Sequence, residues 1–288
     1  MATFTTHSSA SDCPPVTFTL MTYNLWKTKG VATAWKNRRP ILLRQLQKLQ
    51  PDVLFVQELC PAIHECVAEA LPSHSFVVDG GVAGWQNEGN VYYRQSMFTE
   101  IEHGAENIQQ EEEHRRLFWI RLQVIGLGNS TALFSTAHYT WQGHPKEYES
   151  DVNLRKVQAR NTINALSTLQ RDSNEAVFFG GDLNEGFWPK RMLESAGFVD
   201  CFSAMGLPCV PTHPNRSSLA HEEVNSDAVL DWLFAKGEHV RPLLASVIKH
   251  MCGLSSDDPD ERHQLAVVPS DHCPVLSVYR MGTTTLAL

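Results

Sequence analysis

The 288-residue sequence lacks the features that mark membrane and exported proteins. It has no apolar run long enough to cross a bilayer. Its first fifteen residues are rich in Thr, Ser and Ala and have neither the apolar core of a signal peptide nor the arginines of a transit peptide. We therefore expect an intracellular protein, cytoplasmic or nuclear, with a flexible tail over residues 1–15 and no stable membrane association.

Paired cysteines and an excess of positive charge are missing as well. The seven cysteines are odd in number and scattered, without the C-x-x-C spacing of zinc or redox sites, which indicates reduced thiols. The formal net charge is -8, so the chain has no basic field with which to bind a polyanion by counterion release. This excludes a nucleic-acid coat protein but not an enzyme that holds a few phosphates locally.

Nothing in the composition divides the chain into separate domains. With 42% hydrophobic residues it is long enough for one large core, and no shift in composition marks a boundary. We expect a single domain over residues 16–280, a short C-terminal tail over residues 281–288, and a monomer.

What the sequence does contain is a pattern of buried strands that end at polar residues. The clearest case is the apolar run 176–179, followed by Gly180-Gly181 and then by Asp182 and Asn184. Such a run predicts a buried strand, and the glycines would let the backbone turn sharply at its end. An ordinary strand-to-loop turn explains this stretch equally well, because Asp and Asn are common turn formers.

The same pattern recurs along the chain. Asp231 lies inside the apolar strand predicted at 229–234. A carboxylate buried in such a strand needs a partner. Asp271-His272, just before the strand predicted at 275–279, can supply it. Further predicted strands, 16–24, 53–56 and 131–137, end at Asn24, at Gln57-Glu58 and at His138. A lone histidine after a strand, such as His138, is more often structural than catalytic.

Helical spacing of apolar residues predicts helices between the strands, at 35–49, 63–71, 153–169 and 188–196. Two sheets packed face to face with helices outside would bring the strand ends to one rim. Carboxylates, amides and imidazoles gathered there suit a hard divalent ion and hydrolysis by water. The glycine-rich loop 80–89 carries Trp85 and is either a substrate-facing flap or a simple connection, which we favour.

Six short polar motifs follow one another along the chain. They are Thr22-Tyr23-Asn24, Val56-Gln57-Glu58, Thr136-Ala137-His138, Gly181-Asp182-Leu183-Asn184, Leu230-Asp231-Trp232 and Ser270-Asp271-His272. In this order they resemble the endonuclease/exonuclease/phosphatase superfamily of deoxyribonuclease I-like proteins. The resemblance covers about residues 16–280 and implies an α/β fold, a four-layer α/β/β/α sandwich with two packed mixed β-sheets. It also implies a Mg²⁺-dependent hydrolase of phosphate esters, with Mn²⁺ as an alternative ion.

The resemblance implies a role for each matched residue. Glu58 would be the main metal ligand, with Asn24 and Asp271 beside it. His138 would donate to phosphoryl oxygens, and Asp182 and Asn184 would orient the attacking water and the phosphoryl group. His272, held by Asp231, would be the general base or a phosphate-stabilising imidazolium, with Asp182 as the rival base. Thr212 resembles a family position that faces the site.

The substrate is the least determined feature. The Trp-Cys-Asp-Arg signature of the inositol phosphatases is absent at 230–233, and His138 departs from the abasic-site endonucleases. We expect a nuclease-like phosphodiesterase, with DNA or RNA as candidate substrates and with Lys27, Lys29 and Arg155 as local phosphate contacts. The alternatives are a phosphomonoesterase or phospholipase C-like enzyme acting on a phosphorylated small molecule or lipid headgroup, and an inactive scaffold.

Overall fold

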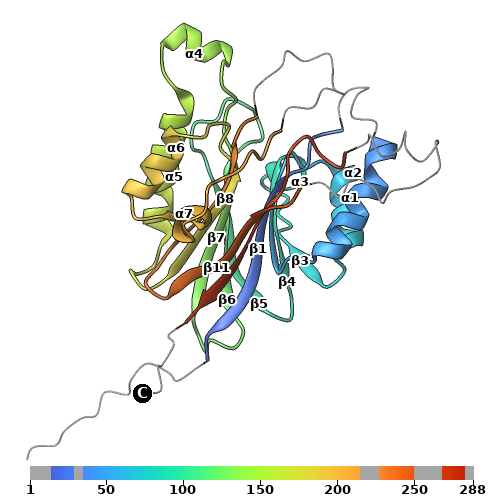
Figure 1. The fold of residues 1–288 in the computed structure, drawn as a ribbon, viewed down its shortest axis with the longest axis vertical. Coiled ribbons are helices and arrows are strands. Elements are labelled where there is room, and N and C mark those ends of the chain that lie inside the picture. Colours follow the sequence, from blue (N-terminus) through green and yellow to red (C-terminus); the bar gives the residue numbers. More distant parts are fainter. Residues whose placement is uncertain (1–13, 29–34, 215–226, 250–267, 283–288) are drawn as a thin grey trace, which may run out of the picture.

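Two six-stranded mixed sheets pack face to face in the computed structural model, which describes residues 14–28, 35–214, 227–249 and 268–282. Helices lie on the outer faces of both sheets (Figure 1). This is the four-layer arrangement that the resemblance implied. Among the described residues, no helix has both the length and the apolar character needed to span a membrane.

The first sheet has the strand order β11-β12-β1-β2-β4-β3. Only β1 and β2 run parallel in it, and the other neighbours are antiparallel. Two leucines of the covering helix α1, and Ile63 and Val67 of α2, pack with Leu54 of the sheet. The elements are β1 (Val16–Asn24), α1 (Trp35–Leu49), β2 (Val53–Gln57), α2 (Pro61–Ala70), β3 (His74–Phe76), α3 (Gly84–Asn87), β4 (Gly89–Arg94), β11 (Val240–Val247) and β12 (Val275–Met281).

The second sheet has the strand order β5-β6-β7-β8-β10-β9. Here β7 and β8 form the parallel pair. Helices α5 and α6 cover this sheet, with Leu166 and Leu193 in its outer core. The elements are β5 (Phe98–Glu106), β6 (Leu117–Val124), β7 (Thr131–His138), α4 (Pro145–Ser150), α5 (Leu154–Leu169), β8 (Ala176–Asp182), α6 (Trp188–Ser195), β9 (Val199–Asp200), α7 (Cys201–Ala204) and β10 (Asp231–Lys236).

Aromatic side chains fill the space between the sheets. The rings of Phe134 and Phe178 stack with their centroids 4.8 Å apart, and Phe18 of the facing sheet meets Phe178 edge-on at 5.4 Å. Trp85, in α3, is fully buried and lies 4.9 Å from Phe118. The loop that carries Trp85 is therefore a connection anchored in the core, and the tryptophan does not form a substrate-facing flap.

The two parallel pairs place the ends of four strands at one edge. In the first sheet Asn24 lies opposite Gln57, and in the second His138 lies opposite Asp182. Strand β10 begins at that same edge, because Asp231 pairs with Asp182 in the antiparallel direction. Residues more than 200 positions apart in the sequence thereby meet at one rim.

The expectation that the central strand ends at Gly180-Gly181 is wrong, because β8 continues through both glycines to Asp182. The glycines serve close packing: a Cβ on Gly181 would lie 2.0 Å from the carbonyl oxygen of Ala137 in β7. Strands β5 and β11 were not predicted either. Each lies at the edge of its sheet and is largely half-exposed, so it shows no alternation of apolar and polar residues.

Replacing Gly181 by alanine should therefore destabilise the protein strongly. The new methyl group collides with backbone, which cannot move aside, and Gly181 has φ +152. We expect a loss of roughly 3 kcal/mol or more in the free energy of unfolding, at the upper end for overpacked sites. Urea denaturation would measure it. Gly80→Ala is the matched control because a Cβ at that position would have no neighbour within 4 Å, and equal stability of the two variants would contradict the close approach.

Candidate active site

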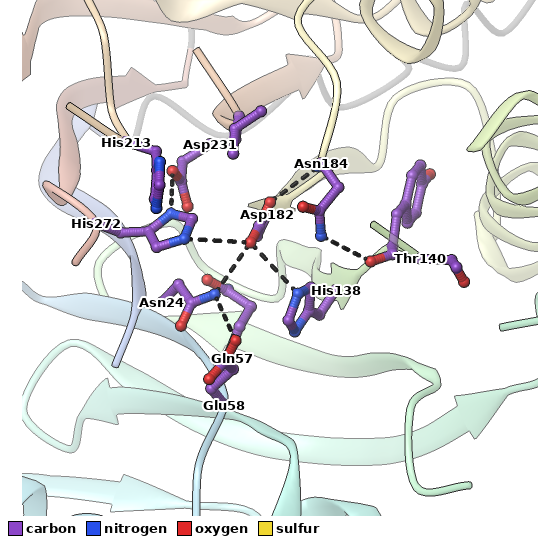
Figure 2. Close-up of polar contacts among 12 residues, drawn as sticks. Asn24, Gln57, Glu58, His138, Thr140, Asp182, Asn184, His213, Asp231 and His272 are labelled. Atoms are coloured by element: carbon purple, nitrogen blue, oxygen red, sulfur yellow. Dashed lines mark hydrogen bonds and ion pairs between the residues drawn. The ribbon is translucent and has the colours of Figure 1, made fainter. Parts of the chain in front are cut away.

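A buried carboxylate, Asp182, lies at the centre of the rim (Figure 2). It accepts hydrogen bonds from the side-chain amide of Asn24 at 3.0 Å and from the backbone N–H of Asn184 at 2.9 Å. Two imidazoles face it, with His138 Nε2 at 3.3 Å and His272 Nε2 at 3.7 Å. Burial alone would raise the pKa of Asp182, but the charges of His272 and His138 and the two hydrogen bonds hold it below its ordinary value.

A second carboxylate supports one of these imidazoles. Asp231 Oδ2 lies 2.8 Å from Nδ1 of His272, and both side chains are buried. Burial opposes a charge on His272, yet the carboxylates of Asp231 and Asp182 raise its pKa well above the ordinary value. Burial raises the pKa of Asp231. Thr212, fully buried, accepts the backbone N–H of Asp231 at 3.0 Å and so fixes the start of β10.

Glu58 and Asp271 form the acidic side of the site. The backbone of Glu58 has φ 56, in the left-handed region, directly after β2 ends. Its carboxylate accepts from the amide of Asn24 at 3.3 Å and from the backbone N–H of Lys27 at 2.8 Å. Burial would raise the pKa of Glu58, but His138, the N–H of Lys27 and His272 lower it.

The donor set on this side fits a hard divalent cation. Burial raises the pKa of Asp271, and the negative charge of Glu58 raises it further. A cation beside Glu58 and Asp271 would stabilise the charged form of Asp271, which burial and Glu58 disfavour. Oxygen ligands in small number are typical of Mg²⁺, which keeps several of its waters.

Glu88 belongs to the site although the sequence analysis did not single it out. Its carboxylate is 3% exposed and forms ion pairs with the ammonium of Lys27 and with Arg115 Nε, the latter at 2.8 Å. His138 Nδ1 lies 3.6 Å from it, so His138 sits between Glu88 and Asp182. Burial would raise the pKa of Glu88, but the contact with His138 and the charges of Arg115 and Lys27 hold it far below its ordinary value. The available signal was its position directly before β4, whose first residue pairs with Gln57.

The expected substrate contacts have different environments. Lys27 is partly exposed, at 31% of its side chain, and can still face solvent from its pair with Glu88. Lys29 lies outside the described residues. Arg155 is buried and uses its donors on Glu147, Glu185 and the carbonyl of Thr140, so the expectation that it contacts substrate does not fit its geometry.

One further residue at the rim was missed. His213 follows Thr212 and packs edge-on against His272, with ring centroids 4.8 Å apart, while its Nε2 lies 4.0 Å from Asp271. The motif Thr212-His213 carried no signal of this proximity, because His213 is positioned by its bridge to Ala228, fifteen residues further along the chain. Within the described ranges, two side-chain groups have metal-ligand spacing: Asp182, Asp231 and His272, and His213, Asp271 and His272.

The sequence profile of the Endonuclease/Exonuclease/phosphatase family matches residues 21–272. No curated protein matches the chain. Three solved structures share its fold at low identity. TDP2 from D. rerio, complexed with single strand DNA product, has a TM-score of 0.67 at 17% identity and covers 91% of this chain and 98% of its own. A mannosyl-6-phosphatase from Bacteroides thetaiotaomicron has a TM-score of 0.68 at 18% identity, and the match covers 90% of this chain and 98% of that one. The human Nocturnin catalytic domain has a TM-score of 0.65 at 13% identity, and the match covers 93% of this chain and 94% of that one.

Removing the charge of Asp231 should lower the pKa of His272. In Asp231→Asn the imidazole stays buried, which lowers its pKa. The negative charge of Asp231, which contributes most to raising that pKa, is lost. Proton NMR titration of the imidazole in metal-free protein would show the shift, and turnover should fall by about two orders of magnitude. His239, an exposed residue directly before β11, provides the internal reference. An unchanged pKa of His272 in a folded variant would refute the pairing.

Proposed function

The chain belongs to the endonuclease/exonuclease/phosphatase family, and on that premise we propose that it is a Mg²⁺-dependent phosphodiesterase, nuclease-like in its substrate, that cleaves by attack of water. The observation that carries the proposal is the ionised Asp182, buried between two imidazoles and two amide donors and next to the Glu58–Asp271 pair. A scaffold has no physical need for such a cluster, because each buried charge costs solvation energy.

Glu58, Asp271 and Asn24 would hold the ion. When bound there, Mg²⁺ would neutralise phosphoryl charge and make the coordinated water more acidic. The like charges of the two carboxylates and the short list of oxygen ligands support this assignment.

The remaining residues act on the phosphoryl group and on water. The N–H groups of His138 and His272 point to the same space as Asp182 and can donate to the non-bridging phosphoryl oxygens (Figure 2). Asp231 keeps Nδ1 of His272 protonated, which favours the imidazolium. A protonated His272 cannot take a proton from water, so in this proposal the acceptor is Asp182, oriented by Asn24 and Asn184.

Two substrate classes have support from similar folds. TDP2 binds a single strand DNA product, which favours a phosphodiester, and the Bacteroides relative is a mannosyl-6-phosphatase, which favours a phosphomonoester. The partly exposed ammonium of Lys27, held beside the metal ligand Glu58, can contact a phosphate next to the scissile one. This favours the phosphodiester and leaves the phosphomonoesterase as the second candidate.

Glu58→Gln should remove most activity, at least a hundredfold in kcat/KM, because a neutral amide binds a divalent ion more weakly. Calorimetric titration with Mg²⁺ should show a parallel loss of affinity, and EDTA should abolish wild-type activity. The matched control is Glu65→Gln, an exposed carboxylate on α2. Full turnover of Glu58→Gln in excess EDTA would overturn the proposal.

Salt dependence separates the two substrate classes. With two to four phosphate contacts, log KM for a single-stranded oligonucleotide should rise with log salt with a slope of about 1.4 to 2.8, and Lys27→Ala should reduce that slope by about 0.7. Lys48→Ala, an exposed lysine on α1, should leave it unchanged. Efficient hydrolysis of a sugar phosphate with no cleavage of any oligonucleotide would instead establish the phosphomonoesterase.

A further inference from the structure

Exposed aromatic side chains are concentrated beside the candidate active site. Among the described residues, the large hydrophobic side chains that are more than one-third exposed include four aromatic ones, Trp141, Tyr148, Phe187 and Trp188, at 47%, 80%, 56% and 45%. All four belong to two segments, 141–148 after β7 and 187–188 after β8. The other exposed side chains of this kind are aliphatic or methionine. We call these four side chains the aromatic platform.

Chain connectivity keeps Trp141 and Phe187 close to the rim. Trp141 follows His138 by three residues and Phe187 follows Asn184 by three, and three residues span at most about 11 Å. The bases of the two segments are joined, because Asn184 Nδ2 donates to the carbonyl of Tyr139 at 2.9 Å. Helix α4, which carries Tyr148, projects beyond the helices that cover the second sheet (Figure 1).

A buried arginine ties the two segments together. Arg155 is 2% exposed and forms ion pairs with Glu147 of α4 and with Glu185 before α6, each at 2.9 Å. Glu147 also accepts the backbone N–H groups of Gly143 and Leu154, at 2.9 and 3.0 Å. Arg155 and Leu154 are the first residues of α5. The network therefore fixes both segments to the start of that helix, and the exposed rings project from a fixed base.

Local contacts arrange the rings in two groups. A Cβ on Gly143 would lie 3.4 Å from Tyr148 Oη and 3.6 Å from the Trp141 ring, so these two side chains flank that glycine. Phe187 and Trp188 pack edge-to-face with centroids 5.0 Å apart. Lys156 Nζ lies 3.7 Å from the centroid of the Trp188 ring, which places a positive charge next to an exposed aromatic face.

We propose that the aromatic platform stacks the unpaired bases of a single-stranded nucleic acid while the scissile phosphate lies at Asp182. This inference rests on the proposed phosphodiesterase function. Aromatic rings beside a cation fit a strand that alternates flat bases with phosphates. Because the net charge is -8, stacking has to supply affinity that a basic surface would otherwise give. Bases in a duplex already stack on each other, so the platform selects single strands.

The test compares two oligonucleotides of equal length, a hexathymidine and a hexamer of base-free sugar phosphates. In the double variant Trp141→Ala with Trp188→Ala, kcat/KM for hexathymidine should fall about tenfold or more, in the range of one to two lost stacking contacts. Cleavage of the base-free hexamer should change less than twofold. Trp141→Phe with Trp188→Phe keeps a ring at each position and should retain most activity. Ile101→Ala with Ile125→Ala, exposed aliphatic positions on β5 and after β6, is the matched control.

Equal losses on the two hexamers would overturn the platform while leaving the phosphodiesterase in place. Binding supplies an independent measurement: fluorescence anisotropy with labelled hexathymidine in EDTA should show weaker affinity for the alanine variant alone. Unchanged affinity in a folded variant would overturn the proposal. A wild-type protein that binds hexathymidine through these rings but cleaves no phosphodiester would instead refute the proposed function. A sugar phosphate whose binding depends on the rings, with no binding of hexathymidine, would replace the nucleic acid as the occupant.

Discussion

The buried negative charge of Asp182 is the constraint on which the rest of the site depends. A carboxylate taken out of water persists as an anion only if donors and cations surround it, and here two amide-type donors and two imidazoles do so. Each imidazole in turn has a carboxylate behind it, Glu88 for His138 and Asp231 for His272. The result is a chain of alternating carboxylates and imidazoles across the rim, in which the position of each group is set by its neighbours.

Both sheets contribute to this chain of groups, so the sandwich has to hold its two halves in register. A buried side-chain bond crosses between the sheets, because Gln57 Nε2 in β2 donates to Thr136 Oγ1 in β7 at 2.8 Å.

Other polar bonds join the loops of the first sheet to one another. Ser270 Oγ donates to the carbonyl of Asn24 at 2.6 Å, and Arg38 from α1 donates to the carbonyls of Trp26 and Pro269, at 2.6 and 2.7 Å. These bonds join the segment after β1 to the segment before β12. The rim residues are thereby positioned by side chains that are not themselves candidates for contact with a substrate.

The same division between reacting and supporting groups holds outside the rim. Arg155 has the chemistry of a phosphate ligand, but its burial among Glu147 and Glu185 makes it a structural tie between two loops. Those loops expose four aromatic side chains. For an acidic protein this is a consistent solution, because the free energy of stacking does not depend on a net positive field.

Period-two and helical patterns predicted most of the strands and helices, because the apolar pattern of a strand or helix is visible in its local sequence. Six short motifs at the polar ends of strands, in family order, led to the α/β/β/α sandwich. Edge strands β5 and β11, half-exposed, left no such pattern. Local sequence marked Asp182, Asp231 and His272 as candidates, but only the tertiary structure decided their contacts. It also placed Glu88 and His213 at the rim and paired Arg155 with carboxylates, since polar contacts between residues 30 to 158 positions apart depend on which strand ends share a rim.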